Sequence, residues 1–391
     1  MAQRPGLLFS SFEPSGDALA AQTIATLIRS RPDLRVYALG GAQMQAAGAE
    51  LLEHTTQHGS MFLDTLRQAR AHRQRLKRLR QWLDTHPLTA LIPVDSPAGN
   101  WSICRAVREM QPQARIIHLV APQLWAWAPW RIRRLRRLTD HVLCLLPFEQ
   151  PWLTDRGVRC TFVGHPAFDP APLPIDSTDA TLPSGSPRLA LLPGSRRGEI
   201  IRNWPTILSA FVRLCRRHEN LEGVVAVLDD RTEALLREVT AGLPRTGWPD
   251  RLTLVTGRTD TVLDWCDAAL VASGTITLQV AARLKPMVVM YNMSRFSAAV
   301  AACVVATRTF TLPNLVSEWA GLGRAVPELV PHFGAVEPVV NEVDRILTDE
   351  TTARRQVEIL TEVVARFNHR CFAEDAPREL LAALNGPSGP C

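Results

Sequence analysis

Short apolar runs alternate with amphipathic stretches along most of the chain. Strands are predicted near residues 7–10, 35–39, 90–94, 115–120, 141–145 and 160–163, and again near 189–192, 223–228, 252–255, 268–272 and 287–291. The stretches between these runs are long enough for crossover helices, which parallel strands need. Two further helices, about 337–348 and 351–367, precede a polar C-terminal segment. The pattern predicts an α/β fold with parallel sheets.

The strands fall into two groups, separated by a segment without hydrophobic periodicity. This segment, DPAPLPIDSTDATLPSGSP (169–187), is rich in Pro and Ser, and we assign residues 171–187 as a linker. At 391 residues the chain is also too long for one typical core. We expect two Rossmann-like, doubly wound domains over residues 1–170 and 188–364, with a C-terminal helix in 365–391 that can return to the first. Ligands of such sheets bind beyond the carboxyl ends of the strands, so we expect the domains to face each other across a cleft.

Composition changes this picture little. Hydrophobic residues make up 46% of the chain and charged residues 21%, which is typical of a folded globular protein. No apolar stretch reaches the length of a membrane span, and the N-terminus does not have the pattern of a signal peptide. The eight cysteines form no CxxC pair, which favours reduced cysteines in a cytoplasmic protein.

The net charge of +6 is unevenly distributed. RQARAHRQRLKRLR (67–80), which includes Arg67, Arg70 and Arg73, follows the apolar residues Met61, Phe62 and Leu63. WRIRRLRR (130–137) overlaps a segment with three tryptophans. An apolar edge beside arginines can bind an anionic bilayer, and RNA binding would produce the same pattern. For either segment alone, the ordinary alternative is a solvated basic helix with core tryptophans.

Three loops between a strand and a helix are candidates for binding an anion. Each places backbone N–H groups at a helix N-terminus, where the helix dipole favours negative charge. The loops lie in EPSGD (13–17), in PGSRRGEI (193–200) and at SGT (273–275). Arg196 in the second loop adds a planar guanidinium suited to phosphate. The alternatives are an N-capped crossover helix for the loop geometry and a solvated arginine pair for Arg196 and Arg197.

Asp95 directly follows the apolar run 90–94. A carboxylate at the end of a strand can act as a general base if it lies within hydrogen-bond reach of a substrate proton. The alternative is an Asx-type turn residue ahead of Pro97. The chain has neither a GxxxxGK[ST] nor a GxGxxG motif, which excludes a P-loop, and no His/Cys cluster has the spacing of a zinc site.

Taken in order, these segments resemble the lipid-A-disaccharide synthase family, glycosyltransferases of the GT-B type. The resemblance covers nearly the whole chain, and each segment alone is a weak signal. The segments are ExSGD at 13–17, DxP at 95–97, LWAWAPWRIRRL from 124, LPFE at 146–149, VGHP at 163–166, LLPGSRRGEI at 191–200, ASGTITL at 272–278, PMVVMY at 286–291 and LPNLV at 312–316.

The resemblance implies a reaction and a division of the chain. An inverting transfer from UDP-2,3-diacylglucosamine to 2,3-diacylglucosamine 1-phosphate would give a β-1,6-linked disaccharide and UDP, without metal or other cofactor. Asp95 would be the base for the acceptor hydroxyl. The acceptor-binding N-terminal half would have a substrate loop formed by Glu13, Ser15, Gly16 and Asp17. The C-terminal half would bind the nucleotide through Gly194, Ser195, Arg196, Ser273, Gly274, Thr275, Gln279 and Asn314.

The resemblance also implies a location. The apolar and basic edge with Met61, Phe62, Leu63, Arg67, Arg70 and Arg73 would bind the cytoplasmic face of the inner membrane, which makes the protein peripheral. No nucleic-acid partner is expected, and a homo-oligomer is compatible with the pattern.

The sequence departs from the family at three places. Gln279 stands where the family usually has Glu, the segment HGSMFLDTL (58–66) replaces a Met- and Gly-rich one, and Ala98 replaces an Asp. These departures leave two alternatives open. One is a GT-B enzyme acting on another UDP-amino sugar or lipid acceptor, and the other is a non-catalytic homologue that binds membrane.

Overall fold

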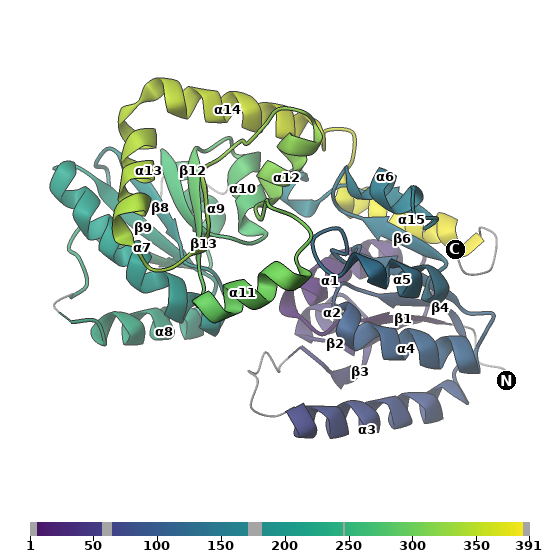
Figure 1. The fold of residues 1–391 in the computed structure, drawn as a ribbon. Coiled ribbons are helices and arrows are strands. Elements are labelled where there is room, and N and C mark those ends of the chain that lie inside the picture. Colours follow the sequence, from purple (N-terminus) through teal and green to yellow (C-terminus); the bar gives the residue numbers. More distant parts are fainter. Residues whose placement is uncertain (1–5, 57–64, 171–181, 245–246, 386–391) are drawn as a thin grey trace. The chain divides into compact units, whose positions relative to one another are not determined.

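The computed structural model describes residues 6–56, 65–170, 182–244 and 247–385 (Figure 1). The chain forms two compact units. The first contains residues 1–169 and 369–391, and the second contains residues 170–368.

The first unit is built on a seven-stranded parallel sheet of order β3-β2-β1-β4-β5-β6-β7. Its strands are β1 (Gly6–Ser10), β2 (Val36–Gly40), β3 (Glu50–His54), β4 (Leu88–Pro93), β5 (Arg115–Leu119), β6 (His141–Cys144) and β7 (Cys160–Phe162). Its helices are α1 (Pro14–Ser30), α2 (Ala42–Ala46), α3 (Thr65–Leu83), α4 (Pro97–Met110), α5 (Ile132–Leu138), α6 (Glu149–Thr154) and α15 (Phe372–Asn385), with the short 3₁₀ helices η2 (Pro129–Arg131) and η3 (Pro166–Phe168).

Strand β1 is apolar at successive positions because both faces of the sheet are covered. Leu7 and Phe9 pack in one core with side chains of α1, α2 and α15, whereas Leu8 packs in the opposite core with α3 and α4. Side chains of a strand alternate between the two faces, so this division follows from the sequence.

Helix α15 connects the C-terminus to the first unit. Phe372 and Leu380 lie in the same core as Leu7. The Asp169 carboxylate accepts hydrogen bonds from the backbone N–H groups of Phe372 (2.6 Å) and Ala373 (3.0 Å). A carboxylate at this end of a helix satisfies otherwise unpaired N–H groups and is favoured by the helix dipole.

The second unit is built on a six-stranded parallel sheet of order β10-β9-β8-β11-β12-β13. Its strands are β8 (Arg188–Leu192), β9 (Glu222–Val227), β10 (Leu252–Thr256), β11 (Ala268–Ala272), β12 (Met287–Asn292) and β13 (Glu328–His332). Its helices are α7 (Arg197–Arg217), α8 (Asp230–Ala241), α9 (Thr259–Trp265), α10 (Ile276–Ala282), α11 (Arg295–Val304), α12 (Leu312–Trp319), α13 (Val336–Thr348) and α14 (Glu350–Ala365). One core packs against α7, α8 and α13, and the other against α9, α10 and α14.

The predicted α/β class is confirmed, and all the predicted strands are present. Two strands were not predicted. β3 (ELLEH) and β13 (ELVPH) lie at sheet edges, and both contain polar or charged residues in a partly exposed pattern. The partial exposure of β3 and β13 removes the continuous apolar run that revealed the other strands.

Candidate active site

Each sheet has one point where the direction of strand addition reverses, and many of the predicted site residues follow the strands at these two points. In the first sheet the point lies between β1 and β4, and in the second between β8 and β11. Ligands of doubly wound sheets bind beyond the carboxyl ends of the strands at such a switch point.

Asp95 lies at the first switch point, in a strained loop between β4 and α4. Asp95 and Ser96 have φ angles of 45° and 36°, which residues other than glycine rarely adopt. Each such residue costs on the order of 1–3 kcal/mol and persists only where its surroundings enforce it.

Asn100 is the residue that holds this loop. Its side chain is fully buried. The amide nitrogen donates to the carbonyl oxygens of Asp95 (2.9 Å) and Val94 (3.1 Å), and the amide oxygen accepts from Ser10 Oγ at 2.7 Å. The Asp95 backbone is therefore fixed to the end of β1 as well as to α4.

A hydrogen bond joins the predicted substrate loop to the Asp95 loop. Glu13 occupies the N-cap position of α1, and its Oε1 accepts a hydrogen bond from Ser96 Oγ at 3.2 Å. Ser15 is exposed in the first turn of α1, whereas Gly16 is buried. A Cβ at Gly16 would lie 2.4 Å from Ser11 Oγ, so any side chain there would displace the Ser11 hydroxyl.

Asp17, the last residue of the predicted substrate loop, is engaged within the protein. Its side chain is buried, and its carboxylate accepts hydrogen bonds from the N–H groups of Gly41 (2.7 Å), Gln43 (3.1 Å) and Met44 (3.4 Å). These donors surround the N-terminus of α2. Asp17 therefore stabilises α2, and its carboxylate contacts backbone instead of facing solvent.

Glu149 is a candidate functional residue that sequence reasoning did not single out. Its buried carboxylate accepts from Trp125 Nε1 (3.0 Å) and from the N–H groups of Leu145 (3.1 Å) and Leu146 (3.0 Å). Burial raises the pKa of Glu149 to about 7, and the negative charge of Asp95 adds to the rise, while the three donors oppose it. A carboxylate with a raised pKa near a candidate base is typical of acid–base sites. The only sequence signal was Glu149 at the end of the LPFE segment.

The loop at the end of β8 presents an arginine to solvent at the second switch point. Gly194 has φ 100°, and a Cβ there would lie 2.9 Å from Glu199 Oε2. Glu199 accepts hydrogen bonds from the Arg196 backbone N–H (3.4 Å) and from its Nη1 (3.1 Å). The Arg196 side chain is nevertheless 68% exposed, and Ser195 is exposed beside it.

The loop at the end of β11 is its neighbour, because β11 pairs with β8 in parallel. The Ser273 N–H donates to the carbonyl oxygen of Met290 at 3.0 Å, which fixes the start of this loop. Gly274 and Thr275 are exposed, and a Cβ at Gly274 would meet nothing within 4 Å. Gln279 lies further along, half-buried in α10.

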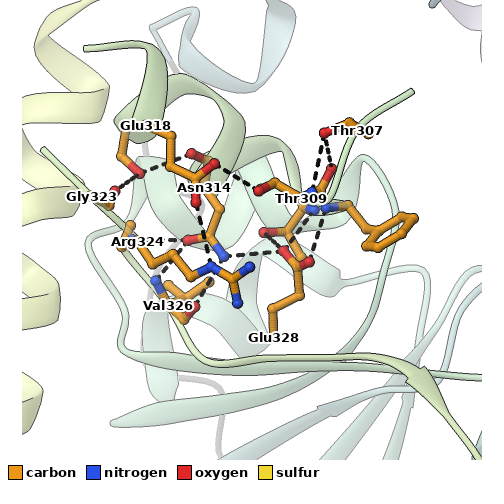
Figure 2. A network of polar contacts seen from close by, with 12 residues as sticks. Thr307, Thr309, Asn314, Glu318, Gly323, Arg324, Val326 and Glu328 are labelled. Atoms are coloured by element: carbon orange, nitrogen blue, oxygen red, sulfur yellow. Dashed lines mark hydrogen bonds and ion pairs between the residues drawn. The ribbon is translucent and has the colours of Figure 1, made fainter. Parts of the chain in front are cut away.

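Asn314 lies inside a buried polar network instead of at an open surface (Figure 2). Its Oδ1 accepts from the N–H groups of Ala325 and Val326, both at 2.9 Å. Its Nδ2 donates to the Val326 carbonyl oxygen (3.0 Å) and to Glu328 Oε2 (3.1 Å). Both polar atoms of this side chain are engaged within the protein, and its contact with the nucleotide stays a prediction.

Glu328 extends the same network to the segment before α12. Its carboxylate accepts from the N–H groups of Phe310 (2.9 Å) and Thr311 (3.0 Å) and from Thr311 Oγ1 (2.8 Å). Thr309 Oγ1 donates to Glu318 at 2.7 Å (Figure 2). Asn314 and Glu328 together fix α12 to β13.

The predicted membrane-facing residues are only partly described. Met61, Phe62 and Leu63 lie outside the described residues, as does the side chain of Arg67, whereas Arg70 and Arg73 are exposed on α3. Trp127 and Trp130 are 46% and 63% exposed, so the alternative of core tryptophans is wrong for these two.

Among the described residues, no helix combines the length and the apolar character needed to cross a bilayer. In the same part of the chain, no group of His, Cys, Asp or Glu side chains is arranged to hold a metal ion.

Comparison with solved structures identifies the fold. The S. aureus MnaA structure with UDP has a TM-score of 0.63 at 13% identity, and the match covers 96% of this chain and 95% of that one. The calicheamicin glycosyltransferase CalG4 has a TM-score of 0.60 at 15% identity, and the match covers 99% and 100%. At these identities the likeness concerns the fold alone, and it confirms the predicted GT-B class with two Rossmann-like units.

Comparison of sequences is more specific. The family model described as lipid-A-disaccharide synthetase matches residues 7–366. The lipid-A-disaccharide synthase of Burkholderia lata is 34% identical over 374 residues, which cover 93% of this chain and 92% of that protein. The match therefore spans both units and includes both switch points. The chain belongs to the lipid-A-disaccharide synthetase family of glycosyltransferases.

Proposed function

We propose that the chain transfers 2,3-diacylglucosamine from UDP to 2,3-diacylglucosamine 1-phosphate, giving the β-1,6-linked disaccharide 1-phosphate and UDP. Family membership supports the disaccharide-forming reaction. The observation that carries the mechanism is the position of Asp95, in a strained and clamped loop at the switch point of the first unit.

In this proposal the first unit binds the acceptor and Asp95 is the general base. The Asp95 carboxylate takes the proton of the acceptor 6-hydroxyl while that oxygen attacks C1 of the donor sugar. The bond between C1 and the diphosphate breaks, and UDP leaves with the bonding electrons. Attack on the face opposite the leaving group inverts the configuration at C1. Because Asn100 fixes the Asp95 backbone, the base requires no loop ordering before it reacts.

The second unit would bind the donor nucleotide at its own switch point. The diphosphate would lie against the Gly194–Arg196 and Ser273–Thr275 loops, which offer exposed hydroxyls and the Arg196 guanidinium. These groups stabilise negative charge on the leaving UDP, and we expect no metal. The presence of UDP in the structural neighbour from S. aureus is consistent with a uridine nucleotide as ligand.

The test is identification of the product. Purified protein is incubated with UDP-2,3-diacylglucosamine and 2,3-diacylglucosamine 1-phosphate, and the lipid product is analysed by mass spectrometry and by NMR of the new linkage. We expect a β-1,6-linked disaccharide 1-phosphate and an equal amount of UDP. UDP release without the acceptor, or no disaccharide from folded protein, would contradict the proposal.

Gln279 favours a second candidate, a GT-B enzyme with a different donor. A carboxylate can accept hydrogen bonds from both ribose hydroxyls, whereas the amide of Gln279 offers one oxygen and no charge. Turnover of a non-acylated UDP-amino sugar in preference to the acylated donor would favour this candidate.

We also propose that the protein binds the anionic cytoplasmic face of the inner membrane without spanning it. The exposed Trp127 and Trp130 and the exposed Arg70 and Arg73 support this, since aromatic side chains and arginines together bind anionic interfaces. Sedimentation with phosphatidylglycerol vesicles, weakened by salt and absent with phosphatidylcholine vesicles, is the expected result.

A further inference from the structure

The first unit contains a basic cavity of about 820 Å³ that is lined by none of the predicted catalytic, nucleotide-binding or substrate-loop residues. Its walls come from α3, α4, α5 and η2. Helix α4 contributes Ala98, Trp101, Ser102 and Arg105, a spacing that places all four on one face of a helix. The opposite wall contains Trp130 and the arginines 131, 133, 134 and 137.

We propose that this cavity binds the phosphate group of the acceptor and so orients the acceptor sugar toward Asp95. The inference rests on the proposed function, because that function supplies an acceptor with both a reacting hydroxyl and a phosphate. It assigns a phosphomonoester site to residues outside the predicted catalytic and nucleotide-binding sets.

Charge is the first argument. The five arginines in the lining are Arg105, Arg131, Arg133, Arg134 and Arg137, and the lining contains no acidic side chain. Within the described part of the chain, none of the five forms an ion pair. Other arginines of this unit do: Arg75 and Arg78 pair with Glu53, Arg80 with Glu109, and Arg108 with Asp140. The cavity therefore concentrates positive charge that the surrounding fold leaves uncompensated.

The orientation of two guanidinium groups is the second argument. Arg131 lies over the ring of Trp101 (4.3 Å to the centroid) and over that of Trp127 (5.0 Å), and Arg134 lies over the ring of Trp101 at 4.8 Å. Stacking occupies the flat faces of the guanidinium groups, so their N–H edges stay available for the two-point contact that phosphate oxygens make.

These stacked arginines also repel each other. Burial lowers the pKa of Arg131, and the charge of Arg134 lowers it further. A bound dianion would relieve this repulsion. The buried indole N–H of Trp101 lacks a hydrogen-bond partner among the described residues, so the lining also retains an unused donor.

Location is the third argument. Ala98 is in the first turn of α4, directly after the Asp95 loop. The segment from Ala98 to Ser102 spans about 6 Å at 1.5 Å per residue, which is comparable to the width of a hexose ring. The acceptor carries its attacking hydroxyl and its phosphate at opposite ends of one sugar, so a cavity that begins in the first turn of α4 suits the phosphate of a sugar whose hydroxyl lies at Asp95. Ala98, where the family pattern has an Asp, keeps negative charge out of the cavity.

The test crosses a change in the protein with a change in the ligand. Wild-type protein and the double variant R131Q/R134Q are each given the acceptor with and without its 1-phosphate, in neutral detergent micelles. We expect loss of the phosphate to lower kcat/KM of the wild type about 10²- to 10⁴-fold, as for two charge-assisted hydrogen bonds. The double variant should be equally slow with both acceptors, with its donor KM unchanged. If phosphate removal costs the variant as much as the wild type, the cavity does not bind this phosphate.

Two controls keep the result interpretable. R29Q removes the same kind of charge from an exposed site at the end of α1 in this unit and should behave as wild type. R105Q/R137Q removes two exposed arginines of the cavity without disturbing the stacking on Trp101, and it should reproduce the effect if R131Q/R134Q does not fold. An R29Q effect equal to that of the cavity variants would indicate general charge attraction and overturn the proposal.

A direct binding measurement separates this inference from the proposed function. Calorimetric titration of wild-type protein with glucosamine 1-phosphate should give binding that glucosamine does not give and that R131Q/R134Q weakens. This result would support the cavity even if no transfer were observed. Loss of binding to phosphatidylglycerol vesicles in the variant, with unchanged response to glucosamine 1-phosphate, would assign the arginines to a lipid headgroup instead and overturn the proposal.

Discussion

The two switch points share a topology and differ in how their loops are held. At the first, Asp95 and Ser96 adopt left-handed backbone conformations that their side chains disfavour, and buried Asn100 holds them there. At the second, the left-handed position is Gly194, and Ser195 and Arg196 face solvent. A clamped loop suits a group that must take a proton from a fixed place, whereas an open basic loop suits an anion that enters and leaves.

The comparison separates proton transfer from leaving-group binding. Substitutions at the first switch point should act on kcat, and substitutions at the second should act mainly on donor binding. The predictions below test this separation, beginning with the largest expected effect.

Asp95→Asn should have the largest effect. The amide keeps the shape of the side chain and cannot accept the hydroxyl proton, so we expect kcat to fall about 10²- to 10⁴-fold, the usual contribution of a general base. Steady-state kinetics at saturating donor and acceptor measure it. A kcat within threefold of wild type would remove Asp95 from the mechanism.

Glu149→Gln tests whether the carboxyl near Asp95 has a raised pKa. The pKa of Glu149 is about 7 in the folded chain against an ordinary 4.5, so between these values the folded chain holds a proton that the unfolded chain has released. The wild type should therefore lose stability as pH rises from about 5 to 7, by on the order of 3 kcal/mol.

The variant should lack that slope, because its amide does not titrate. Urea unfolding of both proteins at pH 5, 6, 7 and 8 is the measurement. The absolute stabilities can differ, since Gln cannot accept all three hydrogen bonds, and only the difference in slope counts. If the unfolding free energies of both proteins change equally with pH, Glu149 does not titrate between pH 5 and 8.

Arg196→Gln tests the open loop at the second switch point. The guanidinium is mostly exposed and held at one side by Glu199, so its loss should not disturb folding. We expect UDP affinity to fall about 10- to 100-fold, as for a lost charged hydrogen bond, with a smaller effect on kcat. UDP titration by calorimetry measures this, and Arg197→Gln, in the next position and also exposed, is the matched control.

Gly194→Ala should have the smallest effect. An L-residue at φ 100° is strained, and its Cβ would crowd Glu199 Oε2, so we expect a loss of about 1–3 kcal/mol in unfolding free energy. The Gly194–Arg196 loop should bind UDP more weakly as a result. Gly274→Ala, where a Cβ meets nothing, should cost less stability, and equal costs would argue against the strain.

The sequence predicted most of the strands, and the places of Asp95 and of the exposed loops after β8 and β11, because these depend on local pattern. Leu7, Leu8 and Phe9 are all buried since both faces of β1 are covered, and Asp95 follows directly from its place after β4. The half-exposed edge strands β3 and β13 lack that signal.

Roles that depend on distant partners could not be predicted. Asp17 accepts hydrogen bonds from N–H groups in Gly41–Met44, and Asn314 is hydrogen-bonded to groups in Ala325–Glu328. The pKa of Glu149 is raised by burial and by the charge of Asp95. Most of these partners are distant in sequence and become neighbours only in the folded chain. A motif therefore cannot show whether such a side chain binds a ligand or stabilises the fold. The sequence left the exposure of Trp127 and Trp130 open between a membrane-binding edge and core tryptophans, because a sequence pattern does not show which apolar residues the fold covers.

The most direct test of this division of roles, proton transfer at the first switch point and donor binding at the second, is two-substrate kinetics of Asp95→Asn and Arg196→Gln beside the wild type. Donor and acceptor concentrations are varied independently, and UDP release is followed. We predict that Asp95→Asn lowers kcat while leaving the donor KM near wild type, and that Arg196→Gln raises the donor KM while retaining most of kcat. The opposite pattern, or an unchanged kcat in Asp95→Asn, would contradict the account.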